Sequence, residues 1–338
     1  MKNRRRMVTF TRIRKVACIG AGTIGRQWAA FFASRGFEVS IHDIRPEITN
    51  SAFSEIKRDV SFLTRKKLVS SRNAKLGLSN LKACAVLEDA VKGANLIQES
   101  VYEDLALKRS VISQIERVVS SNAIIASSSG GGVLPSHIQN VMKHPERFLI
   151  VHPTAQPVYI DPVTELVPGP KTSSKLVREM KGFLESQGKI AITLKKEVEG
   201  FVANRLYFLV WREALDIVGK GVISADELDR LYCHWNMKWL AGVGPFLETH
   251  LHGGSGGSGG FKAALEHYAK QLPYLWETTA TWKTVPKNVR RTALLEARRM
   301  KPVQKGSVQT LRRRRDESRV RIDHLFNSRL IDRIYVSN

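Results

Sequence analysis

The chain has 338 residues, of which 43% are hydrophobic and 25% charged, with a net charge of +23. This length predicts two domains, each with its own buried core. The apolar runs are far shorter than the ~20 residues of a membrane-spanning helix, so we expect a soluble protein without a membrane partner. Three widely spaced cysteines, Cys18, Cys84 and Cys233, fit neither a disulfide framework nor a zinc site. They indicate a reducing compartment, and we expect a cytoplasmic protein without a bound metal.

The positive charge is concentrated towards the two ends of the sequence. Residues 1–15 contain seven lysines and arginines and no acid, and residues 287–333 contain fifteen against five acids. We expect a solvated basic tail at residues 1–14 and a second tail at residues 326–338. Nucleic acid is not an expected partner, because no aromatic side chains that stack on bases lie among the arginines at 312–315.

In chain order, the first predicted elements are a strand, a glycine-rich turn and a helix. Residues 16–19 form an apolar run, and residues 24–35 follow with helical periodicity. Residues 37–41 then alternate apolar and polar side chains, as a strand does. Further strands are predicted at 95–98, 123–127 and 147–152. Because helical stretches separate these strands, the pattern is typical of a doubly wound parallel sheet.

The pattern changes near residue 198. From there the sequence has the periodicity of amphipathic helices and no strand signals. Residues 253–260 read Gly-Gly-Ser-Gly-Gly-Ser-Gly-Gly, a flexible insert, natural or engineered, that interrupts the helices without ending them. We therefore predict an α/β first domain over residues 15–197 and an all-helical second domain over residues 198–325.

The first turn has the glycine pattern with which many domains bind a dinucleotide. Glycines at positions 20, 22 and 25 follow a strand and open a helix, which distinguishes this turn from an ordinary tight turn. The first two glycines let a pyrophosphate approach the backbone amides, and the third lets the helix pack near the strand. The first domain is thus predicted to be a Rossmann domain. Its expected cofactor contacts in this loop are Gly20, Gly22, Thr23, Ile24 and Gly25.

Asp43 follows the second predicted strand, where a ribose of the cofactor is bound in such domains. A carboxylate there accepts hydrogen bonds from the ribose 2′-hydroxyl and repels a 2′-phosphate, which predicts NAD rather than NADP. Arg45, two residues further on, weakens this preference. Asp43 is also an acid close to the start of the helix that Pro46 opens, and the two roles are compatible.

Together with the glycine loop, several further motifs make the chain resemble the 3-hydroxyacyl-CoA dehydrogenase superfamily. They are Gln98-Glu99-Ser100-Val101-Tyr102-Glu103-Asp104-Leu105 with Lys108, His152-Pro153, Glu165-Leu166-Val167, and Gly200-Phe201-Val202-Ala203-Asn204-Arg205-Leu206. Within the superfamily, the chain is most similar to the branch of L-carnitine dehydrogenase and lambda-crystallin/L-gulonate 3-dehydrogenase. Residues 211–215 and 244–251 resemble carnitine dehydrogenase in particular.

The resemblance implies a Rossmann domain followed by a helical substrate and dimerisation domain, and hence a homodimer. It implies an enzyme that uses NAD to oxidise a small L-3-hydroxy acid to the 3-keto acid. It also implies that Glu99 and Lys108 lie near the nicotinamide side of the cofactor.

Oxidation of a secondary alcohol requires a base for the hydroxyl proton, and the resemblance assigns this role to His152. Histidine titrates in the appropriate range, and residue 152 follows an apolar strand at the sheet edge where ligands bind. Glu165 is expected to hold the other imidazole nitrogen, and Asn204 the substrate oxygen. From the residues alone, a structural histidine, an exposed strand glutamate and a helix-capping asparagine are alternative interpretations.

The chain departs from the family pattern beside this predicted site. The family has a serine that binds the substrate hydroxyl, but residues 127–132 read Ser-Ser-Ser-Gly-Gly-Gly, which places Gly130 or Gly131 at the serine position. Ser129 replaces that serine if the loop shifts by one residue, and without it the lost hydrogen bond costs orders of magnitude in rate. Residues 154–157 also lack the asparagine that the family has before the proline.

Three substrates agree with the resemblance: L-carnitine, L-gulonate and a 3-hydroxyacyl-CoA. Aromatic rings bind a quaternary ammonium group by cation–π attraction, which favours L-carnitine, although such rings also pack cores and dimer interfaces. The aromatic candidates are Trp211, Tyr232, Trp235, Trp239 and Phe246, and the basic candidates for a CoA phosphate are Lys66, Lys67 and Arg72. A catalytically impaired, crystallin-like protein that only binds NAD is the alternative that the missing serine favours.

Overall fold

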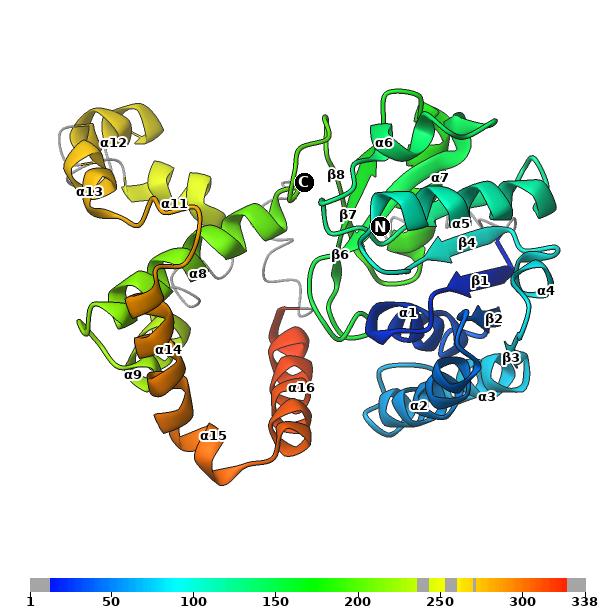
Figure 1. The fold of residues 1–338 in the computed structure, drawn as a ribbon, viewed down its shortest axis with the longest axis horizontal. Coiled ribbons are helices and arrows are strands. Elements are labelled where there is room, and N and C mark those ends of the chain that lie inside the picture. The colour runs from blue at the N-terminus through cyan, green and yellow to red at the C-terminus, as the bar shows by residue number, and fades with distance from the viewer. Residues whose placement is uncertain (1–12, 236–242, 253–259, 270–271, 327–338) are drawn as a thin grey trace, which may run out of the picture. The chain divides into compact units, whose positions relative to one another are not determined.

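The computed structural model describes residues 13–235, 243–252, 260–269 and 272–326. The predicted tails up to residue 12 and from residue 327, most of the glycine–serine insert (253–259) and Trp239 lie outside the described residues. Contacts divide the chain into two units, Met1–Arg205 and Leu206–Asn338 (Figure 1).

The first unit is built on one eight-stranded sheet with the strand order β3-β2-β1-β4-β5-β6-β7-β8. The strands are β1 (Lys15–Ile19), β2 (Glu38–His42), β3 (Leu81–Ala83), β4 (Leu96–Glu99), β5 (Ile124–Ser127), β6 (Phe148–Pro153), β7 (Val163–Pro168) and β8 (Ile190–Thr193). Neighbouring strands are parallel except β6 and β7, which are antiparallel. The predicted fold class is confirmed, and β3, β7 and β8 add to the strands that the sequence predicted.

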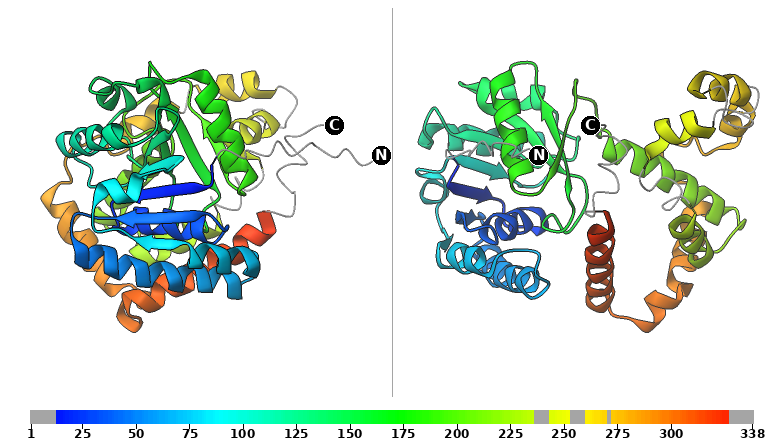
Figure 2. Two further views of the ribbon diagram at one scale, coloured as in Figure 1. Left: turned by 90° about the vertical axis from the view of Figure 1, so that its right-hand side faces the viewer. Right: turned by 180° about the vertical axis from the view of Figure 1, so that it is seen from behind.

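Helices cover both faces of this sheet (Figure 2). On one face lie α1 (Thr23–Ala33), α2 (Pro46–Arg65), α3 (Ser71–Ser79) and α7 (Ser174–Ser186). On the other face lie α4 (Leu87–Val91), α5 (Leu105–Val118) and α6 (Pro135–Gln139). A single 3-10 turn, η1 (Pro145–Arg147), precedes β6.

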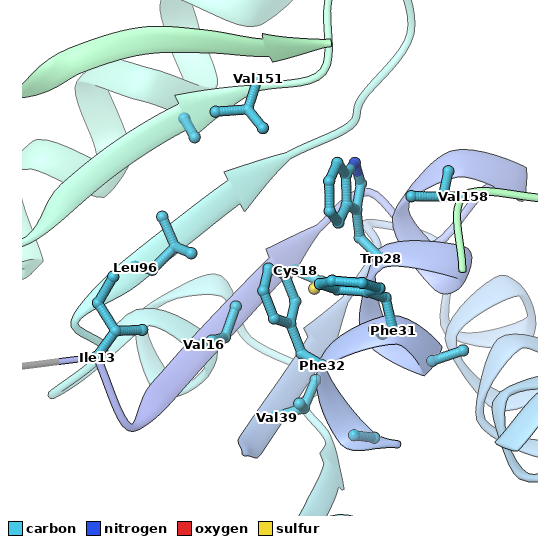
Figure 3. Close-up of a cluster of buried hydrophobic side chains, with 14 of the residues drawn as sticks. Ile13, Val16, Cys18, Trp28, Phe31, Phe32, Val39, Leu96, Val151 and Val158 are labelled. Carbon is cyan, nitrogen blue, oxygen red and sulfur yellow. The ribbon is translucent and has the colours of Figure 1, made fainter. Parts of the chain in front are cut away.

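Aromatic side chains of α1 lie in the cluster of buried hydrophobic side chains between the sheet and helices α1, α2, α3 and α7 (Figure 3). Trp28 and Phe32 are wholly buried and their ring centroids lie 5.6 Å apart, and Phe32 also stacks on Phe183 of α7. Cys18 of β1 lies in the same cluster, and its burial raises the pKa of the thiol, which keeps it unreactive. This packing holds α1 against the sheet and so fixes the position of the glycine loop at its start.

The described elements of the second unit are all helices. They are α8 (Ala203–Gly219), which begins just before the division, α9 (Ala225–His234), α11 (Gly244–His252), α12 (Gly260–Tyr268), α13 (Leu272–Thr278), α14 (Lys287–Arg299), α15 (Lys301–Lys305) and α16 (Val308–Phe326). Glu213 of α8 accepts a hydrogen bond from the Ala280 amide at 2.8 Å, and Asp216 accepts one from the Trp282 indole at 3.3 Å. Helix α8 thereby holds the segment that leads into α14. None of the helices described in either unit is long and apolar enough to cross a membrane.

Candidate active site

The glycine loop begins where β1 ends, and its three glycines are there for different reasons. Gly20 has a φ of +89°, and a β-carbon on it would lie 2.6 Å from the carbonyl group of Ser100. A β-carbon on Gly25 would overlap the carbonyl oxygen of Gly20. Gly22, in contrast, has nothing within 4 Å of the place a β-carbon would take. The fold therefore requires glycine at residues 20 and 25. At Gly22 the absence of a side chain instead leaves open space that no atom of the described residues fills.

The start of α1 is equipped to bind an anion. Its N-cap is Gly22, which has no side chain to bond to the first amides of the helix, and the first turn contains no acid. Thr23 is exposed and Ile24 half-buried at this start. The first amides of α1 thus point their positive dipole ends towards the loop, where a pyrophosphate is bound in dinucleotide sites.

Asp43 lies directly after β2, beside the glycine loop. Its Oδ2 accepts a hydrogen bond from the Ala21 amide at 2.9 Å, and its Oδ1 accepts one from the Arg45 amide at 3.1 Å. The Arg45 guanidinium group is largely exposed, 3.8 Å from the same carboxylate. Asp43 therefore fastens the loop, and a carboxylate at this edge is compatible with the ribose hydroxyls of NAD.

His152 and Glu165 lie opposite each other on the antiparallel strands β6 and β7. The Nδ1 atom of His152 is 2.9 Å from Oε2 of Glu165, and both side chains are buried. The strand register therefore makes the pair that the resemblance implies. The contact occupies Nδ1 and leaves the Nε2 side of the ring for a reacting group.

The other carboxylate oxygen of Glu165 is held by backbone. Its Oε1 accepts hydrogen bonds from the amides of Val202 and Ala203, at 3.0 and 2.9 Å. Burial by itself raises the pKa of Glu165, but the hydrogen bond from His152 and those from the two amides outweigh it and hold the pKa below its ordinary value. Glu165 is thus kept ionised, which suits a partner for an imidazolium.

Phe201 aims those two amides at Glu165. Its φ of 49° lies in the left-handed region, which costs a non-glycine residue about 1–2 kcal/mol. The residue is wholly buried, its ring centroid lies 5.4 Å from that of His152, and its amide donates to the carbonyl of Val198 at 3.0 Å. The surrounding contacts therefore hold a strained turn that positions His152 and Glu165, the dyad of this site.

The loop after β5 meets this turn through two glycines. The amide of Gly200 donates to the carbonyl of Gly131 at 3.1 Å, and Asn204 Nδ2 donates to the carbonyl of Gly130 at 2.9 Å. A β-carbon on Gly131, whose φ is +96°, would lie 2.5 Å from the Gly200 nitrogen. A β-carbon on Gly130 would lie 3.3 Å from Asn204 Nδ2 and 3.8 Å from His152 Nε2. Gly130, rather than Gly131, is therefore the position that faces the dyad.

Ser129 does not take the place of the family's serine. Its hydroxyl is buried, donates to Glu103 Oε1 at 2.5 Å and lies 2.8 Å from the Val133 carbonyl oxygen. The loop is therefore not shifted by one residue, and Ser129 fixes the loop instead of facing His152. This corrects its expected catalytic placement.

Glu99 and Lys108 form a buried ion pair, with 2.9 Å between Lys108 Nζ and Glu99 Oε1. Ser127 and the Val101 amide also donate to Glu99, whose side chain has no exposed surface. Both side chains are closed off from solvent, and their expected place near the nicotinamide side of the cofactor stays a prediction. Glu103 is the exposed carboxylate of this group, and its Oε2 lies 3.3 Å from Lys108 Nζ.

Sequence reasoning missed the roles of Glu103 and Phe201. Glu103 stands in the same motif as Glu99, and only burial distinguishes the two carboxylates. Phe201 follows a glycine within the motif that contains Asn204, but an aromatic residue carries no sequence signal for a left-handed backbone.

The aromatic candidates for a substrate cage are distributed over helices of the second unit. Trp211 lies on α8, Tyr232 on α9 and Phe246 on α11, while Trp235 follows α9, and all four are exposed. Phe246 stacks on Phe261, with 5.5 Å between ring centroids. The described residues contain no group of three or more histidine, cysteine or acidic side chains that could hold a metal ion.

Comparisons with known proteins agree with this geometry. Residues 15–198 match the NAD-binding domain of 3-hydroxyacyl-CoA dehydrogenase, and residues 200–293 match the C-terminal domain of the same family. The chain belongs to the 3-hydroxyacyl-CoA dehydrogenase family. It is therefore an NAD-dependent oxidoreductase.

Similar proteins within the family include named dehydrogenases. L-carnitine dehydrogenase of Oceanobacillus iheyensis is 37% identical over 268 residues, which cover 78% of this chain and 83% of that protein. Lambda-crystallin of Oryctolagus cuniculus is 34% identical over 238 residues, covering 70% and 74% of the two chains. Among solved structures, an NAD-dependent 5-formyl-3-hydroxy-2-methylpyridine 4-carboxylic acid 5-dehydrogenase is 25% identical, with a TM-score of 0.75 over 93% of this chain and 99% of that one.

The different surroundings of Gly22 and Gly25 predict different effects of a methyl group. Gly22→Ala should leave the melting temperature unchanged and weaken NADH binding by about tenfold or more, because the methyl enters only the ligand's space. Gly25→Ala should lower both the melting temperature and the affinity for NADH, because its methyl overlaps the Gly20 carbonyl. Fluorescence titration with NADH and thermal melting measure the two effects. Unaltered NADH affinity in Gly22→Ala would contradict the assigned cofactor position.

The lowered pKa of Glu165 predicts how its contribution to stability depends on pH. A carboxyl with a lowered pKa stabilises the fold above its unfolded-state pKa, and this contribution is lost as the pH falls through the folded-state pKa. Urea unfolding should show Glu165→Gln less stable than wild type by about 1–3 kcal/mol at neutral pH. This difference in stability should shrink when the pH falls below the range in which a glutamate ordinarily titrates. A difference that is constant with pH would show that the charge of Glu165 is not what its partners stabilise.

Proposed function

We propose that the chain oxidises a small L-3-hydroxy acid to the 3-keto acid, with His152 as the base and L-carnitine as the substrate. The observation that carries the proposal is the common orientation of two polar groups. His152 Nε2 and Asn204 Nδ2 both face Gly130, while Nδ1 of the same imidazole is held by Glu165. A substrate hydroxyl placed there has a proton acceptor and a hydrogen-bond donor within reach.

In this proposal His152 takes the proton of the substrate hydroxyl through Nε2. The hydrogen bond from Nδ1–H to Glu165 keeps Nε2 unprotonated before the reaction, and the carboxylate stabilises the imidazolium that forms. Because Glu165 retains its charge through two backbone amides and His152, it orients the ring without taking the proton itself. In the reverse direction His152 returns the proton.

Asn204 binds the substrate oxygen as its bond to hydrogen breaks. The side-chain amide has two N–H groups, and one of them donates to the Gly130 carbonyl. That bond fixes the amide plane, so the second N–H is directed before substrate binds. A donor held in this way stabilises the negative charge that develops on the oxygen.

The cofactor would be held by the glycine loop, the start of α1 and Asp43. Bound NAD supplies the acceptor for the hydride that leaves the substrate carbon. Glu103 is the exposed carboxylate in the loop between β4 and α5, and its contacts with Lys108 and Ser129 keep it in place. We assign Glu103 to the cofactor side of the site, with the buried pair Glu99 and Lys108 supporting it.

The choice of L-carnitine follows from the similarity to L-carnitine dehydrogenase of Oceanobacillus iheyensis. The exposed aromatic side chains of the second unit provide surfaces of the kind that bind a quaternary ammonium group.

The three free cysteines suit a reducing cytoplasm, to which we assign the protein.

A substrate screen tests the proposal. Formation of NADH, followed by absorbance, should have its highest kcat/KM with L-carnitine when L-gulonate and 3-hydroxybutyryl-CoA are compared. His152→Ala should lower kcat/KM by about 10²–10⁴ without weakening NADH binding, because a general base contributes this much. His144→Ala, at an exposed histidine before β6, is the matched control and should be silent. NADH binding without turnover of any of the three substrates would overturn the proposed function.

We also propose that the protein is a homodimer that uses helix α8. This helix exposes six consecutive large apolar side chains: Leu206, Tyr207, Phe208, Leu209, Val210 and Trp211. Consecutive residues point in different directions around a helix, so the apolar surface encircles α8. An apolar surface of this kind marks a protein interface, and a second copy of the chain is the partner that the family resemblance implies.

The dimer is tested by light scattering coupled to gel filtration. Wild type should have twice the monomer mass of 38.0 kDa. Phe208→Glu should shift it towards the monomer, because a charge in an apolar interface is costly. Leu76→Glu, at an exposed position on α3, should leave the mass unchanged. A monomeric wild type would contradict the proposal.

A further inference from the structure

Gly130 is a glycine that the backbone does not require. Its φ is not positive, unlike that of Gly131, and the nearest atom to a β-carbon there is a side-chain nitrogen at 3.3 Å. Gly131 has no such freedom, because its β-carbon would meet the backbone of Gly200. A β-carbon at residue 130 would thus crowd the Asn204 amide and no backbone atom of another segment, so the fold accommodates it when that amide moves by a few tenths of an ångström. What its absence provides is space, and that space adjoins the dyad.

The space beside Gly130 is bordered by groups that bind oxygen. Asn204 Nδ2 and His152 Nε2 lie 3.3 and 3.8 Å from the place that a β-carbon would take, and Gly130 itself is only partly buried, so a ligand atom can enter. A hydroxyl oxygen between the two nitrogens satisfies the proposed alcohol oxidation. A second oxygen on the same substrate carbon needs further space next to the first, and the place that a β-carbon would take at Gly130 offers it, 3.3 Å from Asn204 Nδ2.

A carbon with two hydroxyl groups is a hydrated aldehyde. We propose that this site, in addition to a secondary alcohol, oxidises short aldehydo acids in their hydrated form, with 3-oxopropanoate as the simplest example. The inference rests on the proposed function in one respect, the role of His152 as base. The hydrate of 3-oxopropanoate is itself a 3-hydroxy acid that has one further hydroxyl on the reacting carbon, and the space at Gly130 receives that hydroxyl.

The reaction balances with the groups already described. His152 takes the proton from one hydroxyl, the electron pair of that O–H bond forms the new C=O bond, and the C–H bond breaks with transfer of hydride to NAD. The second hydroxyl stays on the carbon and loses its proton to water. The aldehyde hydrate becomes a carboxylate, here malonate, as NAD is reduced to NADH, and the aldehyde's own hydration supplies the second oxygen.

A β-carbon at residue 130 separates the two activities, because it occupies the place of the second hydroxyl. Gly130→Ala fills the space without adding a donor, and Gly130→Ser fills it and adds a hydroxyl that can bind the alcohol oxygen. Both variants should lose oxidation of 3-oxopropanoate by about tenfold or more in kcat/KM. Oxidation of L-carnitine should fall less than that of 3-oxopropanoate in Gly130→Ala, whose β-carbon also crowds the Asn204 amide. In Gly130→Ser it should exceed that of Gly130→Ala, because a further hydrogen bond stabilises the oxygen in the transition state.

The experiment uses the full chain with freshly prepared 3-oxopropanoate and NAD. NADH is followed by absorbance, malonate is identified by mass spectrometry, and NADH titration checks that each variant retains its cofactor site. Malonate formed by wild type and lost selectively in both variants supports the inference. Absence of malonate from a wild type that oxidises L-carnitine overturns it, as does an equal loss of both activities in Gly130→Ala. Malonate formation without oxidation of any of the three alcohols supports the aldehyde activity and overturns only the proposed substrate class.

Discussion

The carboxylate of Glu165 is the point on which the rest of the site depends. It is buried, yet it accepts hydrogen bonds from His152 on the neighbouring strand and from the amides of Val202 and Ala203. A buried charge is stable only when its bonds are satisfied, so the carboxylate requires the turn at residue 201 to be in place. The left-handed backbone of Phe201 provides that turn. One interaction therefore joins strands β6 and β7 to the beginning of α8 and orients the imidazole as well.

The close approach of two glycine-containing loops completes this arrangement. Gly131 and Gly200 are joined through a backbone hydrogen bond at a distance that no side chain would permit. The approach brings the Gly130 carbonyl to Asn204, which fixes the amide opposite His152. Ser129, the residue before Gly130, points to Glu103 instead. In this chain the loop after β5 therefore places a backbone carbonyl and an open space beside the dyad. Its serine hydroxyls hold the loop in place.

Local sequence patterns predicted the features that depend on neighbouring residues. The glycine loop and Asp43 follow from a strand, a turn and a helix in succession, and the apolar run before His152 predicted strand β6. The roles of His152 and Glu165 came from the family resemblance, because their pairing depends on the register of two strands that sequence periodicity does not give. Strand β8, a four-residue run of Ile-Ala-Ile-Thr with three residues exposed, was missed. The placement of Ser129 and the burial of Glu99 depend on which way a side chain turns, and the sequence contains no signal for either.

The central claim is that a substrate oxygen is held between His152 and Asn204, beside an unfilled space at Gly130. A crystal structure of the chain with NADH and L-carnitine tests this most directly, because it locates the hydroxyl relative to all three residues. The account predicts a hydroxyl within hydrogen-bond distance of both His152 Nε2 and Asn204 Nδ2, with no protein atom between it and Gly130. A hydroxyl bound elsewhere, or a loop after β5 that moves the Ser129 hydroxyl onto it, would contradict the account.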